Sequence, residues 1–121
     1  MKETFVTLLA KVQNIIEHFD ELSKKLKLIC ELLRDDVNYY NWVGFYFLDE
    51  NKKELVLGPF VGEPTEHVRI PLGKGICGQV ALNKNTMIIQ YVTKEDNYLS
   101  CSINVQSEIV VPILKDSNFI G

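Results

Sequence analysis

The residues best suited to chemistry are two cysteines and a glutamate in the second half of the chain. Cys77 lies in a glycine-rich turn, Cys101 lies in a polar loop, and Glu108 opens the apolar stretch that follows. A thiolate can act as a nucleophile and a redox group, and a nearby carboxyl can supply a proton. Such groups are commonly placed on loops beside a sheet. We therefore expect Cys77, Cys101 and Glu108 to converge on a small-molecule pocket and to carry out redox chemistry there.

The local sequence around Cys77 favours its thiolate form. Gly73 and Gly75 permit a tight turn, and residues 76–83 are predicted to form a short helix whose first turn holds Cys77. The amino-terminal end of a helix carries a partial positive charge, which stabilises a thiolate.

The remaining cysteine pattern indicates a reducing environment. Three cysteines at wide spacing do not make a disulfide framework. Cys30 shares one helical face with Leu26, Ile29 and Leu33, so we expect it to be a core residue. Because no CxxC, HExxH or clustered His and Cys pattern is present, we expect no metal site and no bound cofactor.

Length and charge exclude several classes of function. A chain of 121 residues with 46% hydrophobic and 24% charged residues is expected to form one domain, residues 1–121. A net charge of −3 argues against a nucleic-acid partner, which requires a clustered excess of Lys and Arg. No apolar run approaches the roughly 18 residues of a membrane span, and the first residues lack a signal peptide's apolar core. We therefore expect a cytoplasmic protein without a membrane or nucleic-acid partner.

The predicted elements are two helices followed by a mostly β region. Residues 1–34 are expected to form the helical part, with helices at 5–19 and 21–33 and with Asp20 capping the second. Residues 40–121 are expected to hold the sheet and the pocket loops. The apolar side chains expected to face inward from the two helices include Leu9, Ile16 and Leu22. The predicted strands cover residues 42–49, 54–61, 67–70, 86–90 and 109–114.

The first predicted strand places several aromatic side chains on one face. Strand alternation puts Trp42, Gly44 and Tyr46 on the same side. Gly44 could leave room for a pocket between the two rings, or the rings could form a packed aromatic core. The pattern alone leaves both interpretations open.

The end of the sequence carries three further expectations. The loop from Tyr91 to Gln106 is long for a compact domain, which is typical of functional or mobile loops. The stretch 109–114 is almost wholly apolar, so we expect it to be buried on both faces and interrupted at Pro112. A last strand starts at residues 118–121 and has barely begun, so either the sheet ends on a stub or the natural protein continues. If it ends there, we expect marginal stability or a homodimer through an exposed strand edge.

Four motifs together resemble the free methionine-(R)-sulfoxide reductases, which are GAF domains. They are Asn41-Trp-Val-Gly-Phe-Tyr46, Leu57-Gly-Pro-Phe60, Arg69-Ile-Pro-Leu-Gly-Lys-Gly-Ile-Cys-Gly78 and Ser107-Glu-Ile-Val-Val-Pro112. The resemblance covers the chain from about Asn41 onward, and the preceding helix pair fits the family's amino-terminal helices. It implies an α+β sandwich in which helices flank a central antiparallel sheet, a small closed pocket, and reduction of free methionine sulfoxide.

The resemblance also implies roles for individual residues. Cys101 matches the attacking thiol, Cys77 a second family cysteine, and Glu108 a carboxylate that faces the substrate. Trp42 and Tyr46 match aromatic residues that hold the substrate's methyl group and side chain. The thiol cycle implied by the family ends in a disulfide that a thioredoxin-type reductant reopens.

The sequence departs from the family pattern at three places. His67 occupies the position of a frequent third cysteine that often resolves the sulfenic acid, so Cys77 or an external thiol would have to do so. Tyr98 and Ser102 stand near Cys101 where the family commonly has His and Asp. The acidic pair of the family's last strand would lie beyond Gly121.

Two functions from different classes follow from these observations. The first is a thiol-dependent enzyme that reduces free methionine-(R)-sulfoxide. The second is a non-catalytic GAF domain that binds or senses a small molecule. Cys101 favours the enzyme, because a sensor has no need of a nucleophile in a polar loop.

Overall fold

The computed structural model describes residues 2–90 and 107–121. Cys101, together with the rest of the predicted loop at 91–106, lies outside the described residues. The chain forms two compact units, Met1–Phe45 with Gly58–Gly62 and Tyr46–Leu57 with Glu63–Gly121.

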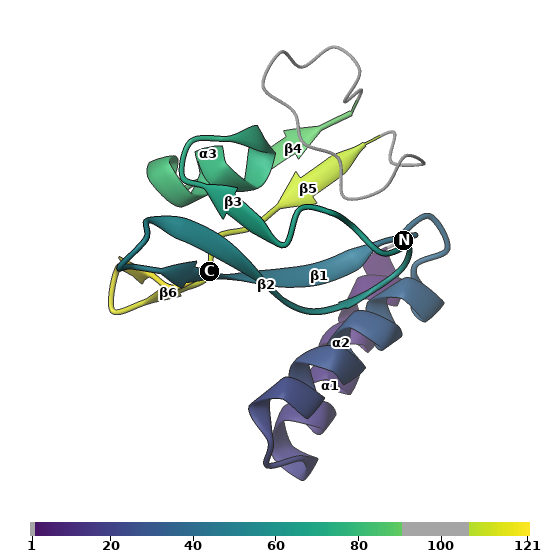
Figure 1. Cartoon of the computed structure of the whole chain (residues 1–121). Helices are drawn as coiled ribbons and strands as arrows, with labels where there is room; N and C mark the ends of the chain where they lie inside the picture. Colours follow the sequence, from purple (N-terminus) through teal and green to yellow (C-terminus); the bar gives the residue numbers. More distant parts are fainter. Residues whose placement is uncertain (1, 91–106) are drawn as a thin grey trace. The chain divides into compact units, whose positions relative to one another are not determined.

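The first unit contains the two predicted helices, α1 (Lys2–His18) and α2 (Leu22–Asp36), which pack against each other (Figure 1). Leu8 and Cys30 are buried, with 3% and 0% of their surface exposed, and Lys11 Nζ lies 2.7 Å from Asp36 Oδ2. The core prediction for Cys30 is therefore confirmed.

The helices differ from the prediction in which side chains they bury and how the second one starts. Leu9, Ile16 and Leu22 are exposed in the structure, so the buried stripes are narrower than their spacing suggested. The prediction that Asp20 caps α2 is wrong, because Glu21 occupies the cap position and its side chain makes no capping hydrogen bond. The spacing of apolar residues identifies a helix, but it does not show how much of the helix surface is covered by the element that packs against it.

A three-stranded sheet follows, with the order β1-β2-β3. Its strands are β1 (Val43–Asp49), β2 (Glu54–Val61) and β3 (Arg69–Pro71), in agreement with three predicted strands. The antiparallel register of β2 and β3 places Leu55 opposite Ile70, and each is only 2% exposed. The chain passes from one unit to the other within β1, within β2 and again after Gly62.

Helix α3 (Gly75–Asn83) follows β3 and packs against it in the second unit (Figure 1). Its inward side chains Ile76 and Val80 are four residues apart and are each 1% exposed. A side chain at Gly78 would come within 2.8 Å of the Pro71 carbonyl oxygen, so the close approach of helix and strand requires glycine there. The predicted helix at 76–83 is confirmed.

The remaining strands form two short antiparallel pairs, β4 (Met87–Ile89) with β5 (Glu108–Val110) and β6 (Leu114–Lys115) with β7 (Asn118–Phe119). The Leu48 N–H donates a 3.0 Å hydrogen bond to the Ile120 carbonyl, which joins the end of the chain to β1. Because the described residues form three helices and antiparallel strands, the α+β class is confirmed.

The stretch 109–114 differs from the prediction. Its strand pairing stops at Val110 and resumes at Leu114, in line with the interruption expected at Pro112. The prediction that this stretch is buried on both faces is wrong, because Ile109 is 48% and Val111 59% exposed.

Within the described residues, no helix combines the length and the apolar character that a membrane crossing requires.

Candidate functional site

The predicted site residues fall into three groups. Tyr46, Cys77 and Glu108 belong to the second unit, Trp42 belongs to the first, and Cys101 lies outside the described residues.

Glu108 carries the most unusual environment in the described part of the chain. It is the first residue of β5, opposite Ile89 of β4. Its Oε2 atom is buried and has no hydrogen-bond partner among the described residues. Burial raises the pKa of the Glu108 carboxyl from 4.5 to about 7. A carboxyl with this pKa is partly protonated at neutral pH and can donate a proton.

Cys77 lies in the first turn of α3, as predicted. It is partly buried between Ile76 and Gly78, which are both buried. Cys77 therefore lies at the positive end of the α3 dipole. Helix α3 also packs against β5, the strand that begins with Glu108. The structure therefore places the helix with the thiol beside the strand with the buried carboxyl.

Tyr46 makes a hydrogen bond that the sequence did not suggest. Its hydroxyl donates to the main-chain oxygen of His67 at 2.8 Å, and only 8% of the residue is exposed. The His67 N–H in turn donates to Thr65 Oγ1 at 3.1 Å. The Tyr46 hydroxyl thus holds the segment before β3, and its single proton is engaged within the fold.

Trp42 fills the space that Gly44 leaves open. A side-chain carbon at Gly44 would lie 2.5 Å from Cη2 and 2.7 Å from Cζ3 of the indole. The Trp42 ring also stacks on Phe60, with a centroid distance of 5.4 Å and an interplanar angle of 15°. The sequence left open whether this face holds a pocket or a packed aromatic core. Beside Gly44 the space is packed. Phe60 is the last residue of the motif Leu57-Gly-Pro-Phe60. Neither its residue type nor its spacing from Trp42 predicted that the two rings would stack.

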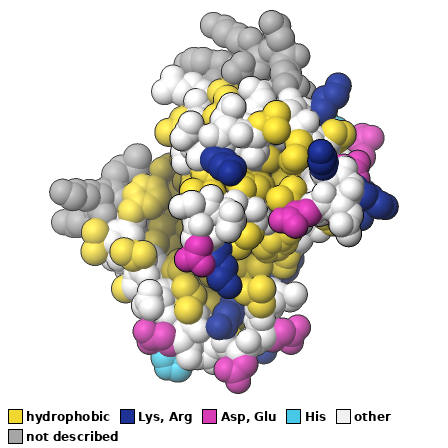
Figure 2. Space-filling view, turned by 90° about the vertical axis from the view of Figure 1, so that its left-hand side faces the viewer, with side chains coloured by type: hydrophobic (Ala, Val, Ile, Leu, Met, Phe, Trp, Pro, Cys, Tyr) yellow, Lys and Arg dark blue, Asp and Glu magenta, His cyan; other side chains and the backbone are white. Residues whose placement is uncertain are grey.

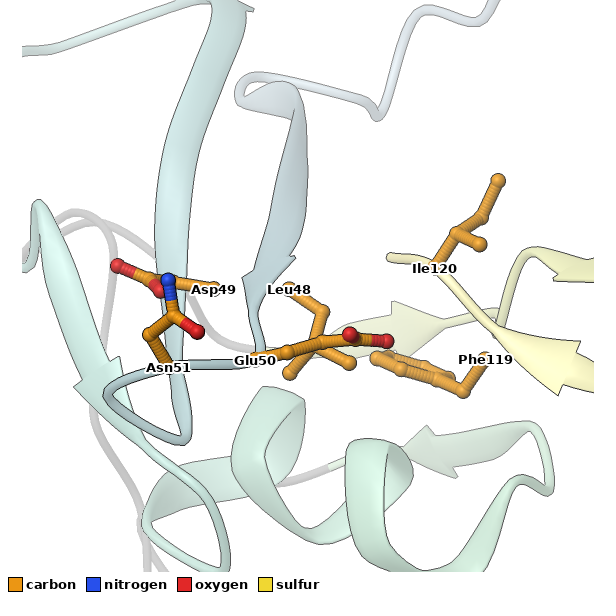
Figure 3. Close-up of a pocket in the computed structure, with 6 residues that line it drawn as sticks. All are labelled: Leu48, Asp49, Glu50, Asn51, Phe119 and Ile120. Atoms are coloured by element: carbon orange, nitrogen blue, oxygen red, sulfur yellow. The ribbon is translucent and has the colours of Figure 1, made fainter.

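A separate pocket of about 510 Å³ lies in the second unit, lined by residues that were not predicted as site residues (Figure 3). The lining comes from the end of β1, the turn after it and the end of the chain: Leu48, Asp49, Glu50, Asn51, Phe119 and Ile120. Asp49 Oδ2 is already 3.2 Å from Arg69 Nη1, which also pairs with Glu54. We assign no chemistry to this pocket, because the Asp49 carboxylate that lines it already forms an ion pair with Arg69.

Charged and apolar side chains are interspersed on the face of the molecule shown in Figure 2. Within residues 2–90 and 107–121, no group of three or more His, Cys, Asp or Glu side chains could hold a metal ion.

Comparison with known proteins finds both GAF domains and reductases. The chain is 34% identical over 120 residues to GAF domain-containing protein A of Dictyostelium discoideum, covering 99% of this chain and 74% of that protein. It is 38% identical over 90 residues to the free methionine-R-sulfoxide reductase of Escherichia coli, covering 74% of this chain and 53% of the reductase. The chain thus spans about half the length of that relative. No protein-family model matches the chain.

Solved structures give the same result. The type II free methionine-R-sulfoxide reductase of Thermoplasma acidophilum superposes with a TM-score of 0.76 at 37% identity, covering 81% of this chain and 68% of that one. The free methionine-R-sulfoxide reductase of Neisseria meningitidis, solved with its substrate, superposes with a TM-score of 0.87 at 32% identity. That match covers 93% of this chain and 66% of the Neisseria chain.

Proposed function

The chain belongs to the free methionine-R-sulfoxide reductase family of GAF domains, and we propose that it reduces free methionine-R-sulfoxide to methionine. The observation that carries this proposal is the buried Glu108 carboxyl, whose pKa is raised to about 7. Sulfoxide reduction requires a proton for the oxygen, and a carboxyl with this pKa can supply it at neutral pH. The reductases with similar structures support the choice of substrate.

The proposed reaction begins at Cys101. Its thiolate attacks the sulfur of the sulfoxide while Glu108 gives a proton to the oxygen. The oxygen passes to the cysteine sulfur, so the substrate leaves as methionine and Cys101 becomes a sulfenic acid. The substrate sulfur gains two electrons and the cysteine loses two, which balances the step.

Recycling requires a second thiol. Cys77 would attack the Cys101 sulfenic acid, forming a disulfide and releasing water. The position of Cys77 in the first turn of α3, at the positive end of the helix dipole, supports this role. A thioredoxin-type dithiol would then reduce the disulfide. We propose that this cycle operates in the cytoplasm, which keeps such thiols reduced.

The family resemblance assigns Trp42 and the ring of Tyr46, each in its own unit, to the apolar end of the substrate, and we propose these contacts for this chain. The indole stacks on Phe60, and the Tyr46 hydroxyl is occupied by the His67 oxygen. Both rings are thus fixed by contacts within the protein, so they lose little freedom when an apolar group such as the substrate's methyl binds.

The proposal is tested by consumption of free methionine-R-sulfoxide with excess dithiothreitol, in parallel with the S epimer. Dithiothreitol replaces the resolving thiol, so the assay depends on the pocket, the attacking thiol and the proton donor alone. We expect turnover of the R epimer, loss of at least about 1000-fold in Cys101→Ser, and loss of about 10- to 100-fold in Glu108→Gln. Equal turnover of both epimers, or an active Cys101→Ser variant, would refute the proposed site.

A further inference from the structure

Trp42 is held in a hollow formed by three residues of the first unit. A side-chain carbon at Gly44 would meet the indole at Cη2 and Cζ3, and one at Gly62 would come within 2.8 Å of Cδ1. The two glycines therefore flank opposite ends of the same ring system. Phe60 stacks on the indole at 5.4 Å with nearly parallel planes.

Phe60 is itself anchored by helix α2. Lys27 Nζ donates a 2.6 Å hydrogen bond to the Phe60 carbonyl oxygen and lies 5.9 Å from the centre of the Phe60 ring. A lysine over an aromatic ring adds a favourable electrostatic contact. The order of contacts thus runs from α2 through Phe60 to the indole of Trp42.

We infer that Phe60 and Gly44, with Gly62, are positioning residues that hold the Trp42 indole ready to receive the apolar end of the substrate. This inference rests on the proposed function, because it concerns how the proposed substrate site is prepared. A ring that is fixed before binding loses little freedom when the substrate arrives, and this strengthens binding. The positioning residues act through Trp42 and have no part in the chemical step.

Gly44 and Phe60 allow the inference to be tested from two directions. Gly44→Ala adds a methyl group where the indole lies, whereas Phe60→Leu removes the stacking ring and Phe60→Tyr restores one. Gly62 is a poorer choice, because its φ of +124° makes any substitution strained regardless of the indole. Phe19→Leu is a matched control, since Phe19 also lies beneath a lysine, with Lys24 Nζ 5.2 Å from its ring centre.

The experiment uses the intrinsic fluorescence of the full chain, which contains a single tryptophan, Trp42. Acrylamide quenching measures how accessible the indole is without ligand, and titration with free methionine-R-sulfoxide measures the Kd. Steady-state turnover with dithiothreitol gives kcat and KM. We expect Gly44→Ala and Phe60→Leu to increase quenching, to raise Kd and KM about fivefold and to leave kcat within about twofold, because aromatic stacking contributes on this scale. Phe60→Tyr and Phe19→Leu are expected to behave like the unaltered protein.

The inference can fail while the proposed function stands. If Gly44→Ala does not fold, the comparison of Phe60→Leu with Phe60→Tyr decides the inference. Unchanged quenching and unchanged Kd in Phe60→Leu would overturn it, and so would an equal loss of affinity in the Phe19→Leu control. If the unaltered protein binds no methionine-R-sulfoxide, the proposed function fails and the inference fails with it.

Discussion

The Tyr46 hydroxyl donates a 2.8 Å hydrogen bond to the main-chain oxygen of His67. This contact joins the middle of β1 to the segment that leads into β3 within the second unit. Position 67 is also where the family resemblance places a frequent cysteine that this chain lacks. A residue predicted to hold substrate therefore fixes the backbone at that position.

The first prediction concerns the stability that this hydrogen bond provides. Tyr46→Phe removes the donor and leaves the His67 oxygen without it, so we expect the free energy of unfolding to fall by about 1–2 kcal/mol. Urea unfolding measures the change, with Tyr39→Phe as the control because Tyr39 is 57% exposed. Equal stability of Tyr46→Phe and the unaltered protein would show that the bond contributes nothing in solution.

The second prediction concerns the pH dependence of stability. The pKa of Glu108 is raised from 4.5 to about 7 by burial, so the folded state holds a proton that the unfolded state releases above about pH 4.5. The stabilising effect of protonation is therefore complete below pH 4.5 and is lost as the pH rises to about 7. We expect Glu108→Gln to remove this loss, which amounts to about 2–3 kcal/mol at neutral pH.

The control for this prediction is Glu66→Gln, which changes an exposed carboxyl of the same unit. Unfolding curves in urea between pH 4.5 and 8 compare the three proteins. If Glu108→Gln and Glu66→Gln had the same pH profile, the Glu108 carboxyl would not be buried as described.

The third prediction separates the roles of the two reactive thiols. Cys77→Ser should keep the first turnover and full activity with dithiothreitol, but should lose at least about 10-fold of the rate with a thioredoxin-type reductant, because it cannot form the disulfide that this reductant recognises. Stopped assays with the two reductants measure the difference. Loss of the first turnover in Cys77→Ser would instead identify Cys77 as the attacking thiol.

The fourth prediction concerns Cys30. Burial raises the pKa of its thiol to about 11, its side chain is fully buried, and its Sγ lies 3.7 Å from the Pro59 carbonyl oxygen. Because the thiolate is the reactive form, we expect Cys30 to resist iodoacetamide in the folded protein and to react only after unfolding. Peptide mapping by mass spectrometry checks this, and labelling of Cys30 as fast as Cys77 would contradict it.

Elements defined by local patterns could be predicted closely from the sequence. Strands β1 and β2 and helix α3 begin within one residue of their predicted starts, because strand alternation, turn residues and glycines act over a few positions. The family motifs likewise identified the fold class correctly.

Features that depend on distant neighbours could not be predicted. Ile109 and Val111 are apolar yet exposed, because burial depends on what covers a strand and not on its composition. The space beside Gly44 is filled by the indole of Trp42. The sequence does not give the orientation of this indole, so it could not show whether the space is open or filled. The raised pKa of Glu108 similarly arises from the packing around β5.

The most direct test of the central claim is a single-turnover measurement without any reductant. The protein is fully reduced, freed of the reductant and mixed with excess free methionine-R-sulfoxide, and the methionine formed per chain is measured. We predict about one methionine per chain from the R epimer and none from the S epimer or from Cys101→Ser, because one thiolate accepts one oxygen. No methionine from the R epimer, while this ligand still changes the fluorescence of Trp42, would contradict the enzyme and identify a GAF domain that only binds its ligand.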